Sequence, residues 1–190
     1  KTGDDNIVTL QFDGVYMDSD VWLNGKHLGR HPYGYTPFAF ELTPYLRPAG
    51  EENILAVRVK NLGKNSRWYS GSGIYRHVWL VEKNLIHVAH WGTFVTTPEV
   101  SAELANVQLN IQIENKTGLE QEIAVNSSIT DADGKVVAKA ESELMVTKGI
   151  SALTQNFKMK NPALWSPENP NLYRIKTELI GDGKVLDEYD

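Results

Sequence analysis

The sequence predicts an all-β chain made of two β-sandwich domains. Apolar and polar residues alternate with a period of two, most plainly over 107–113, where Val, Leu and Ile are separated by Gln and Asn. Turn residues divide the chain into short runs at regular spacing, and no long helical period occurs in its 190 residues. Aromatic residues become sparse after Asn84, so we expect domains at residues 1–84 and 85–190.

The first domain is expected to contain short strands joined by tight turns. The pair Asn24-Gly25 stands between two apolar runs, and both residue types tolerate the positive φ of a type I′ hairpin turn. Thr43 followed by Pro44 predicts a helix cap and one short helical turn. The alternation over 55–59 predicts another half-buried strand.

The second domain is expected to consist of strands with a plainer alternation. The segment 131–135, "DADGK", predicts a hairpin turn, and the three prolines of 161–173 exclude a central strand there. We expect Trp165 to anchor this segment within the domain. The strands predicted around these segments are 123–130, 136–140, 174–180 and 184–189.

Composition and charge exclude several classes of partner. The net charge of −5 argues against nucleic acid, and no Lys or Arg run suggests a membrane surface. No apolar run approaches the roughly 20 residues of a membrane helix. The chain has no cysteine, so disulfides, thiolate metal sites and Cys nucleophiles are excluded.

No credible catalytic constellation is found in the sequence. Two carboxylates could cleave a glycosidic bond, but Asp18 and Asp20 alternate along one strand, where we expect a solvated face. His87 and His90 are three residues apart on a predicted strand, so they are expected on opposite faces and not in a metal site. The sequence therefore predicts no catalytic residue, no metal ligand and no cofactor.

The segment 67–80, "RWYSGSGIYRHVWL", allows two interpretations. In the first, its aromatic residues fill the core and Gly71 and Gly73 form a β-bulge; we expect core packing for Ile74, Val78 and Leu80. In the second, Trp and Tyr faces stack on the C–H faces of a sugar while Arg hydrogen-bonds its hydroxyls. This second interpretation concerns Arg67, Trp68 and Tyr69.

The segments "DSDVWLNGKHLGRHPYGYTPFAFELTPYL" (18–46), "RWYSGSGIYRHVWL" and "NPALWSPENPNLYRIKTEL" (161–179) resemble glycoside hydrolase family 2, the family of β-galactosidases, β-glucuronidases and β-mannosidases. The resemblance implies part of a jelly-roll, galactose-binding-like domain followed by an immunoglobulin-like sandwich. It also implies a C-terminal (β/α)₈ barrel, missing here, that carries both catalytic glutamates of a retaining mechanism.

The resemblance implies that these domains scaffold the barrel and border its active site. Arg67, Trp68 and Tyr69 would contact a carbohydrate substrate, as would Tyr33 and Tyr35 of the "HPYGYTP" loop. Family β-galactosidases carry an acidic residue near the position of Arg67, and this departure leaves the sugar open. Arg76 is expected to be structural.

The favoured function is the non-catalytic part of a family 2 hydrolase of β-galactosidase type. A free-standing carbohydrate-binding or adhesion module is the alternative, and a purely structural pair of sandwiches is a third. Oligomer surfaces are among the expected features. A periplasmic or secreted bacterial location is favoured over a cytoplasmic one.

Overall fold

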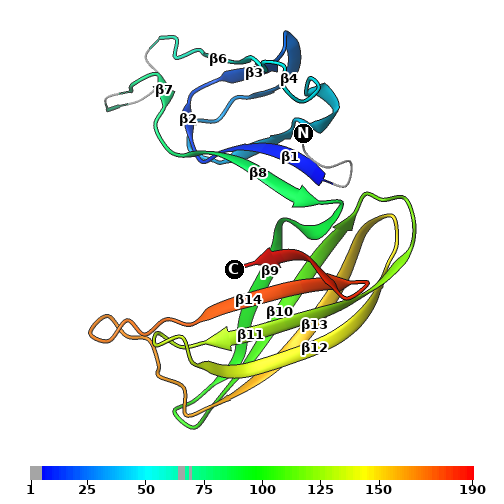
Figure 1. Ribbon diagram of the computed structural model, residues 1–190. Helices are drawn as coiled ribbons and strands as arrows, with labels where there is room; N and C mark the ends of the chain where they lie inside the picture. The colour runs from blue at the N-terminus through cyan, green and yellow to red at the C-terminus, as the bar shows by residue number, and fades with distance from the viewer. Residues whose placement is uncertain (1–5, 64–66, 69) are drawn as a thin grey trace. The chain divides into compact units, whose positions relative to one another are not determined.

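A computed structural model describes residues 6–63, 67, 68 and 70–190. Strands are the main secondary structure of these residues, and the all-β prediction is confirmed (Figure 1). The chain divides into two compact units, Lys1–Lys83 and Asn84–Asp190. Among the described residues, no helix has the length and apolar character to cross a membrane.

The first unit contains three small antiparallel sheets. Their strand orders are β5-β1-β8, β4-β3-β6 and β2-β7. The strands are β1 (Asn6–Phe12), β2 (Val15–Tyr16), β3 (Ser19–Leu23), β4 (Lys26–His31), β5 (Phe38–Glu41), β6 (Leu55–Val59), β7 (Gly73–Ile74) and β8 (Val78–Asn84).

Alternation along β1 and β3 supplies the core of this unit. Phe12 and Val21 are fully buried, and the Phe12 ring stacks on Phe38 with 4.9 Å between centroids. The hairpin between β3 and β4 turns at Asn24 (φ 52°) and Gly25 (φ 80°). Both residues have the positive φ of a type I′ turn, so this turn prediction is confirmed.

The predicted cap at Thr43 is wrong, although the short helical turn exists. A 3₁₀ helix, η1 (Thr43–Tyr45), follows β5, and Leu42 occupies its N-cap position without a side-chain hydrogen bond. The Thr43 hydroxyl instead accepts a hydrogen bond from the backbone N–H of Val8, at 2.8 Å. Thr43 therefore ties the turn to β1 instead of capping the helix.

The expected core packing of Ile74, Val78 and Leu80 is wrong for the described chain. All three are exposed, and Leu80 retains 69% of its accessible surface. Val78 and Leu80 lie on β8, which pairs with β1 and is the edge strand of its sheet among the described residues, whereas Ile74 lies on the two-residue strand β7.

The solvated face expected for Asp18 and Asp20 is also wrong. The side chain of Asp20 is only 8% exposed, and its Oδ2 lies 2.7 Å from Nη2 of Arg58. Asp18 pairs with Arg30 of β4. These carboxylates face basic residues on the neighbouring strands, and the Asp18 side chain remains 22% exposed.

The second unit is a sandwich of two antiparallel sheets, ordered β13-β10-β9 and β12-β11-β14-β15 (Figure 1). The strands are β9 (Ile86–Val100), β10 (Leu104–Asn115), β11 (Gln121–Thr130), β12 (Val136–Val146), β13 (Gly149–Lys160), β14 (Arg174–Gly181) and β15 (Lys184–Tyr189).

The predicted alternation over 107–113 accounts for the centre of this sandwich. Val107, Leu109, Ile111 and Ile113 are all buried and form one cluster with residues of the opposite sheet. The two sheets are also joined by polar contacts, since Gln155 Nε2 of β13 donates to the carbonyl oxygen of Val125 at 2.9 Å.

The pairing of β9 with β10 is irregular at two places. From Val88 to Thr93 it advances five residues while β10 passes only from Ile113 to Ile111. Trp91 (φ 52°) lies in this bulge, and a Cβ on Gly92 would stand 2.7 Å from the carbonyl oxygen of Gln112. The second irregularity lies between Asn106 and Gln108 of β10.

The role expected for Trp165 as an anchor is wrong, because its side chain is 61% exposed. The segment is held by other groups: the backbone N–H of Ala163 donates to the Tyr173 hydroxyl at 2.8 Å, and Asn171 Nδ2 donates to the carbonyl oxygen of Leu164 at 2.9 Å. Trp165 contributes instead to the lining of an apolar pocket of about 290 Å³.

Candidate carbohydrate-contact site

The loop between β4 and β5 carries two of the predicted sugar-contact residues. The Tyr33 and Tyr35 rings meet edge to face with 5.6 Å between centroids, and both side chains are more than half exposed. His31, at the start of the loop, stacks on Phe38 at 4.4 Å and lies 3.0 Å from the Thr36 hydroxyl through Nε2. These contacts fix both ends of the loop.

Tyr16 of β2 packs against this loop. Its ring meets Tyr35 edge to face, with centroids 5.4 Å apart. A Cβ on Gly34 would lie 2.4 Å from Cδ2 of Tyr16, so only glycine permits this approach. Burial, together with a hydrogen bond to Tyr35, raises the pKa of Tyr16.

Tyr75 brings the segment after β7 to the same loop. Its hydroxyl donates to the carbonyl oxygen of Gly34 at 2.8 Å, and its backbone N–H donates to the carbonyl oxygen of Gly14 at 3.3 Å. Strand β7 pairs with β2, with Val15 opposite Ile74. Four tyrosines from three segments therefore gather at one place: Tyr16, Tyr33, Tyr35 and Tyr75, which we call the tyrosine cluster.

The other three predicted sugar-contact residues are Arg67, Trp68 and Tyr69. Arg67 and Trp68 are exposed, Trp68 to 80%. Tyr69 lies outside the described residues. The structure thus brings Tyr33 and Tyr35 together, whereas Arg67 and Trp68 stand at the surface a few residues before β7.

Sequence reasoning missed Tyr16 and gave Tyr75 only a core role. Tyr75 is half exposed, and its position directly after the Gly73-Ile74 bridge was the signal that could have identified it. Tyr16 gave no comparable signal, because its contact with Tyr35 depends on the path of a loop 17 residues later.

The tyrosine cluster presents groups of the kind that bind sugars. Exposed aromatic faces stack on sugar C–H faces, and phenolic hydroxyls can donate and accept hydrogen bonds. In the described part of the chain, no group of three or more His, Asp or Glu side chains is placed to hold a metal ion.

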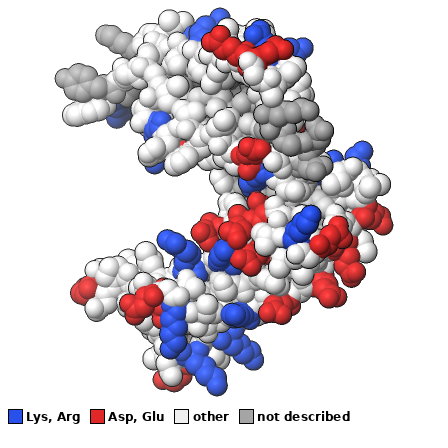
Figure 2. Space-filling view, viewed as in Figure 1, with Lys and Arg blue, Asp and Glu red and all other residues white. Residues whose placement is uncertain are grey.

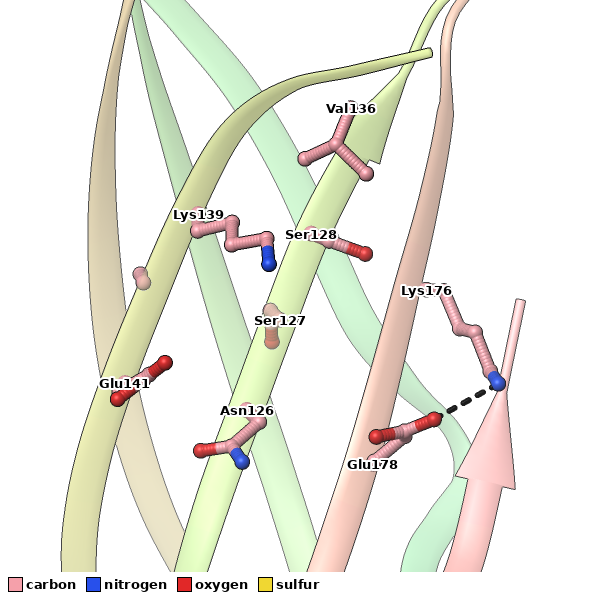
Figure 3. Close-up of a pocket in the computed structure, with 9 residues that line it drawn as sticks. Asn126, Ser127, Ser128, Val136, Lys139, Glu141, Lys176 and Glu178 are labelled. Atoms are coloured by element: carbon pink, nitrogen blue, oxygen red, sulfur yellow. Dashed lines mark hydrogen bonds and ion pairs between the residues drawn. The ribbon is translucent and has the colours of Figure 1, made fainter. Parts of the chain in front are cut away.

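The second unit carries a polar groove of about 210 Å³ on the sheet of β12, β11 and β14 (Figure 3). Two rows of side chains cross it: Lys139, Ser128 and Lys176 form the first, and Glu141, Asn126 and Glu178 form the second. Lys176 Nζ lies 2.8 Å from Glu178 Oε1 and 3.1 Å from Glu188 Oε1. Hydrogen bonds to Glu178 and Glu188 raise the pKa of Lys176, so this lysine is committed to internal pairs.

Charges of both signs occur on the face shown in Figure 2. In the second unit, Lys and Arg gather at the lower left of the view and most Asp and Glu lie on the other side (Figure 2).

The chain is thus a pair of β-domains, the first of which presents exposed aromatic side chains. The model "Glycosyl hydrolases family 2, sugar binding domain" matches residues 2–84, and the model "Glycosyl hydrolases family 2" matches residues 86–190. The chain belongs to glycosyl hydrolase family 2.

Relatives and solved structures agree with this assignment. The chain is 43% identical to beta-galactosidase BoGH2A of Bacteroides ovatus over 185 residues, which cover 96% of this chain and 22% of that protein. It is 39% identical to a putative beta-glucuronidase of Formosa agariphila, covering 94% of this chain and 16% of that protein. A crystal structure of a family 2 member from Bacteroides cellulosilyticus superposes with a TM-score of 0.94 at 40% identity, over 98% of this chain and 26% of that one.

These matches also show how the length of the chain compares with that of its relatives. It spans 22% and 16% of the length of the two relatives and 26% of the solved structure. The chain thus corresponds to a minor part of each protein that it resembles.

Proposed function

We propose that this chain forms two non-catalytic domains of a longer family 2 glycoside hydrolase, and that the parent is a retaining enzyme of β-galactosidase type. The domains scaffold a (β/α)₈ barrel elsewhere in the same polypeptide, and that barrel supplies the two glutamates. The parent cleaves terminal β-linked sugars without an organic cofactor.

The observation that carries this proposal is the tyrosine cluster within a domain of the family's sugar-binding type. A rigid set of exposed aromatic rings is what the rim of a sugar site requires, because stacking on a preformed platform needs little ordering of side chains. The similarity to named beta-galactosidases and beta-glucuronidases supports the reaction class.

The test uses a polypeptide extended in the native reading frame on both sides of residues 1–190. It is assayed against chromogenic β-galactosides and β-glucuronides, with the 190-residue chain as the control. We expect turnover by the extended polypeptide, foremost of the β-galactoside, and none by the control. A folded extended polypeptide that leaves the whole panel intact would refute the proposal.

The alternative function, a free-standing carbohydrate-binding or adhesion module, rests on the same exposed tyrosines. It predicts that the reading frame ends near Asp190 and that the chain alone binds a glycan through Tyr33 and Tyr35. Loss of glycan binding in a Tyr33→Ala, Tyr35→Ala variant, together with an inactive extended polypeptide, would establish this alternative.

A further inference from the structure

Trp79 and His77 form another exposed aromatic surface in the first unit. Their ring centroids are 5.3 Å apart, and the ring planes are inclined by 31°. Trp79 retains 50% of its accessible surface, and the His77 side chain retains 78%. These two rings belong to β8 and the residues just before it, and neither is a member of the tyrosine cluster.

Asp13 fixes the orientation of this surface. Trp79 Nε1 donates to Asp13 Oδ2 at 2.9 Å, and the backbone N–H of Asp13 donates to the carbonyl oxygen of His77 at 3.0 Å. Gln11 Nε2 donates to Asp13 Oδ1 at 3.1 Å. Because the indole is tied to β1 and its extension, its orientation is set before any ligand arrives.

The Asp13 carboxylate is charged and retains acceptor capacity. The hydrogen bond from Trp79 is the main cause that holds its pKa below the ordinary value; burial opposes this effect, while Gln11, His77 and Arg76 reinforce it. Each carboxylate oxygen has about two lone-pair positions and accepts one hydrogen bond described above, and Oδ2 also lies 3.8 Å from His77 Nδ1. With 26% of the side chain exposed, the free positions are open to a donor from solvent or ligand.

We propose that Trp79, His77, Asp13 and Gln11 form a binding site for a neutral pyranose. The C–H face of the sugar stacks on the indole, adjacent hydroxyls donate to Asp13, and the Gln11 amide offers a further polar contact. A uronic acid is disfavoured, because its carboxylate would meet the negative charge of Asp13. The site goes beyond the proposed function, which depends on the tyrosine cluster and on residues outside this chain.

The test titrates the folded 190-residue chain with methyl β-D-galactopyranoside, methyl β-D-glucopyranoside and glucuronate, followed by tryptophan fluorescence and saturation-transfer NMR. We expect dissociation constants on the order of 1 mM for the neutral sugars and weaker binding of glucuronate. Trp79→Ala abolishes binding of the neutral sugars. Asp13→Asn weakens it about ten-fold, as for loss of a hydrogen bond to a charged group.

Trp91→Ala is the matched control, because Trp91 is 58% exposed and its ring also contacts a histidine, His90, at 4.2 Å. This variant leaves binding unchanged. Circular dichroism checks the fold of each variant, and if Trp79→Ala fails to fold, His77→Ala and Trp79→Phe replace it and are expected to weaken binding.

Three results would overturn the site: no binding of either neutral sugar, unchanged affinity in the folded Trp79 and His77 variants, or equal loss in Trp91→Ala. Because these results do not involve glycosidase turnover, failure of this site is distinguishable from failure of the proposed function.

Discussion

The hydroxyl of Tyr75 donates a 2.8 Å hydrogen bond to the carbonyl oxygen of Gly34, which lies 41 residues earlier in the chain. This bond joins the segment that follows Arg67 and Trp68 to the loop that carries Tyr33 and Tyr35. The order of the whole tyrosine cluster therefore depends in part on one phenolic oxygen.

Removing that oxygen should destabilise the first unit. Tyr75→Phe keeps the ring but leaves the Gly34 carbonyl without this donor, so we expect a loss of about 0.5–1.5 kcal/mol in the free energy of unfolding. Urea denaturation measures the loss. Tyr33→Phe is the control, because it removes a hydroxyl from a side chain that is 55% exposed; an equal loss in the control would contradict the role given to Tyr75.

A methyl group at Gly34 should disturb the same cluster. In Gly34→Ala the new Cβ would stand 2.4 Å from Cδ2 and 3.0 Å from Cε2 of Tyr16. Because the Tyr16 ring must move, we expect a loss of about 1–3 kcal/mol. Gly71→Ala is the matched control, since a Cβ there meets no atom within 4 Å. Thermal unfolding of the two variants should differ clearly, and similar midpoints would argue against the close approach.

Arg67 is predicted to contact substrate in the parent enzyme. In the extended polypeptide, Arg67→Ala should lower kcat/KM about ten-fold, as for the loss of one hydrogen bond from a charged group. Steady-state kinetics with the preferred chromogenic substrate measure the change. The control is Arg174→Ala, which removes an exposed arginine from the second unit. An unchanged kcat/KM in Arg67→Ala would sink the predicted contact.

Asp20 should make the stability of the first unit sensitive to acid. The hydrogen bond from Arg58 is the main cause that lowers the pKa of Asp20 from its ordinary value of 3.8; burial opposes it, and His27 and Lys60 act in the same direction as Arg58. A carboxyl group whose folded pKa is depressed stabilises the fold above its unfolded pKa. This contribution is therefore fully present above 3.8 and is lost as the pH falls through the lower folded value.

The corresponding variant is Asp20→Asn, which should be less stable than the parent chain near neutral pH and should lose less stability on acidification below about pH 4. Denaturant unfolding across this pH range checks both parts. Asp133→Asn, in the exposed turn between β11 and β12, is the control and should follow the parent curve. Parallel curves for the parent chain and Asp20→Asn would show that Asp20 carries no such linkage.

Local patterns were sufficient to predict most strands. The alternation over 107–113 and the Asn24-Gly25 turn depend on side-chain direction and backbone φ, and both act between near neighbours in the sequence. The structure agrees with them residue by residue, because Leu109 and Ile111 are buried and both turn residues have positive φ.

The errors arose where burial depends on distant strands. Asp20 alternates with apolar residues as a solvated residue would, yet Arg58 of β6 and His27 of β4 enclose it. Leu80 has the composition of a core residue but lies on an edge strand. Only half of the tyrosine cluster was predicted, for the same reason. Tyr33 and Tyr35 are close in sequence, whereas Tyr16 and Tyr75 reach this loop from distant segments, Tyr16 through the Tyr35 ring and Tyr75 through the Gly34 carbonyl.

The bulge at Trp91 and Gly92 constrains any attempt to recombine this domain with its relatives. Before the bulge, even-numbered Val88 stands opposite Ile113; after it, odd-numbered Thr93 and Val95 stand opposite Ile111 and Leu109. Before the bulge, an even-numbered residue of β9 therefore pairs with a buried residue of β10, and after the bulge odd-numbered residues do so. A chimaera whose crossover point lies within β9 must take the complete bulge from one parent protein. A segment shorter or longer by one residue would turn the outward side chains of β9 toward the interior.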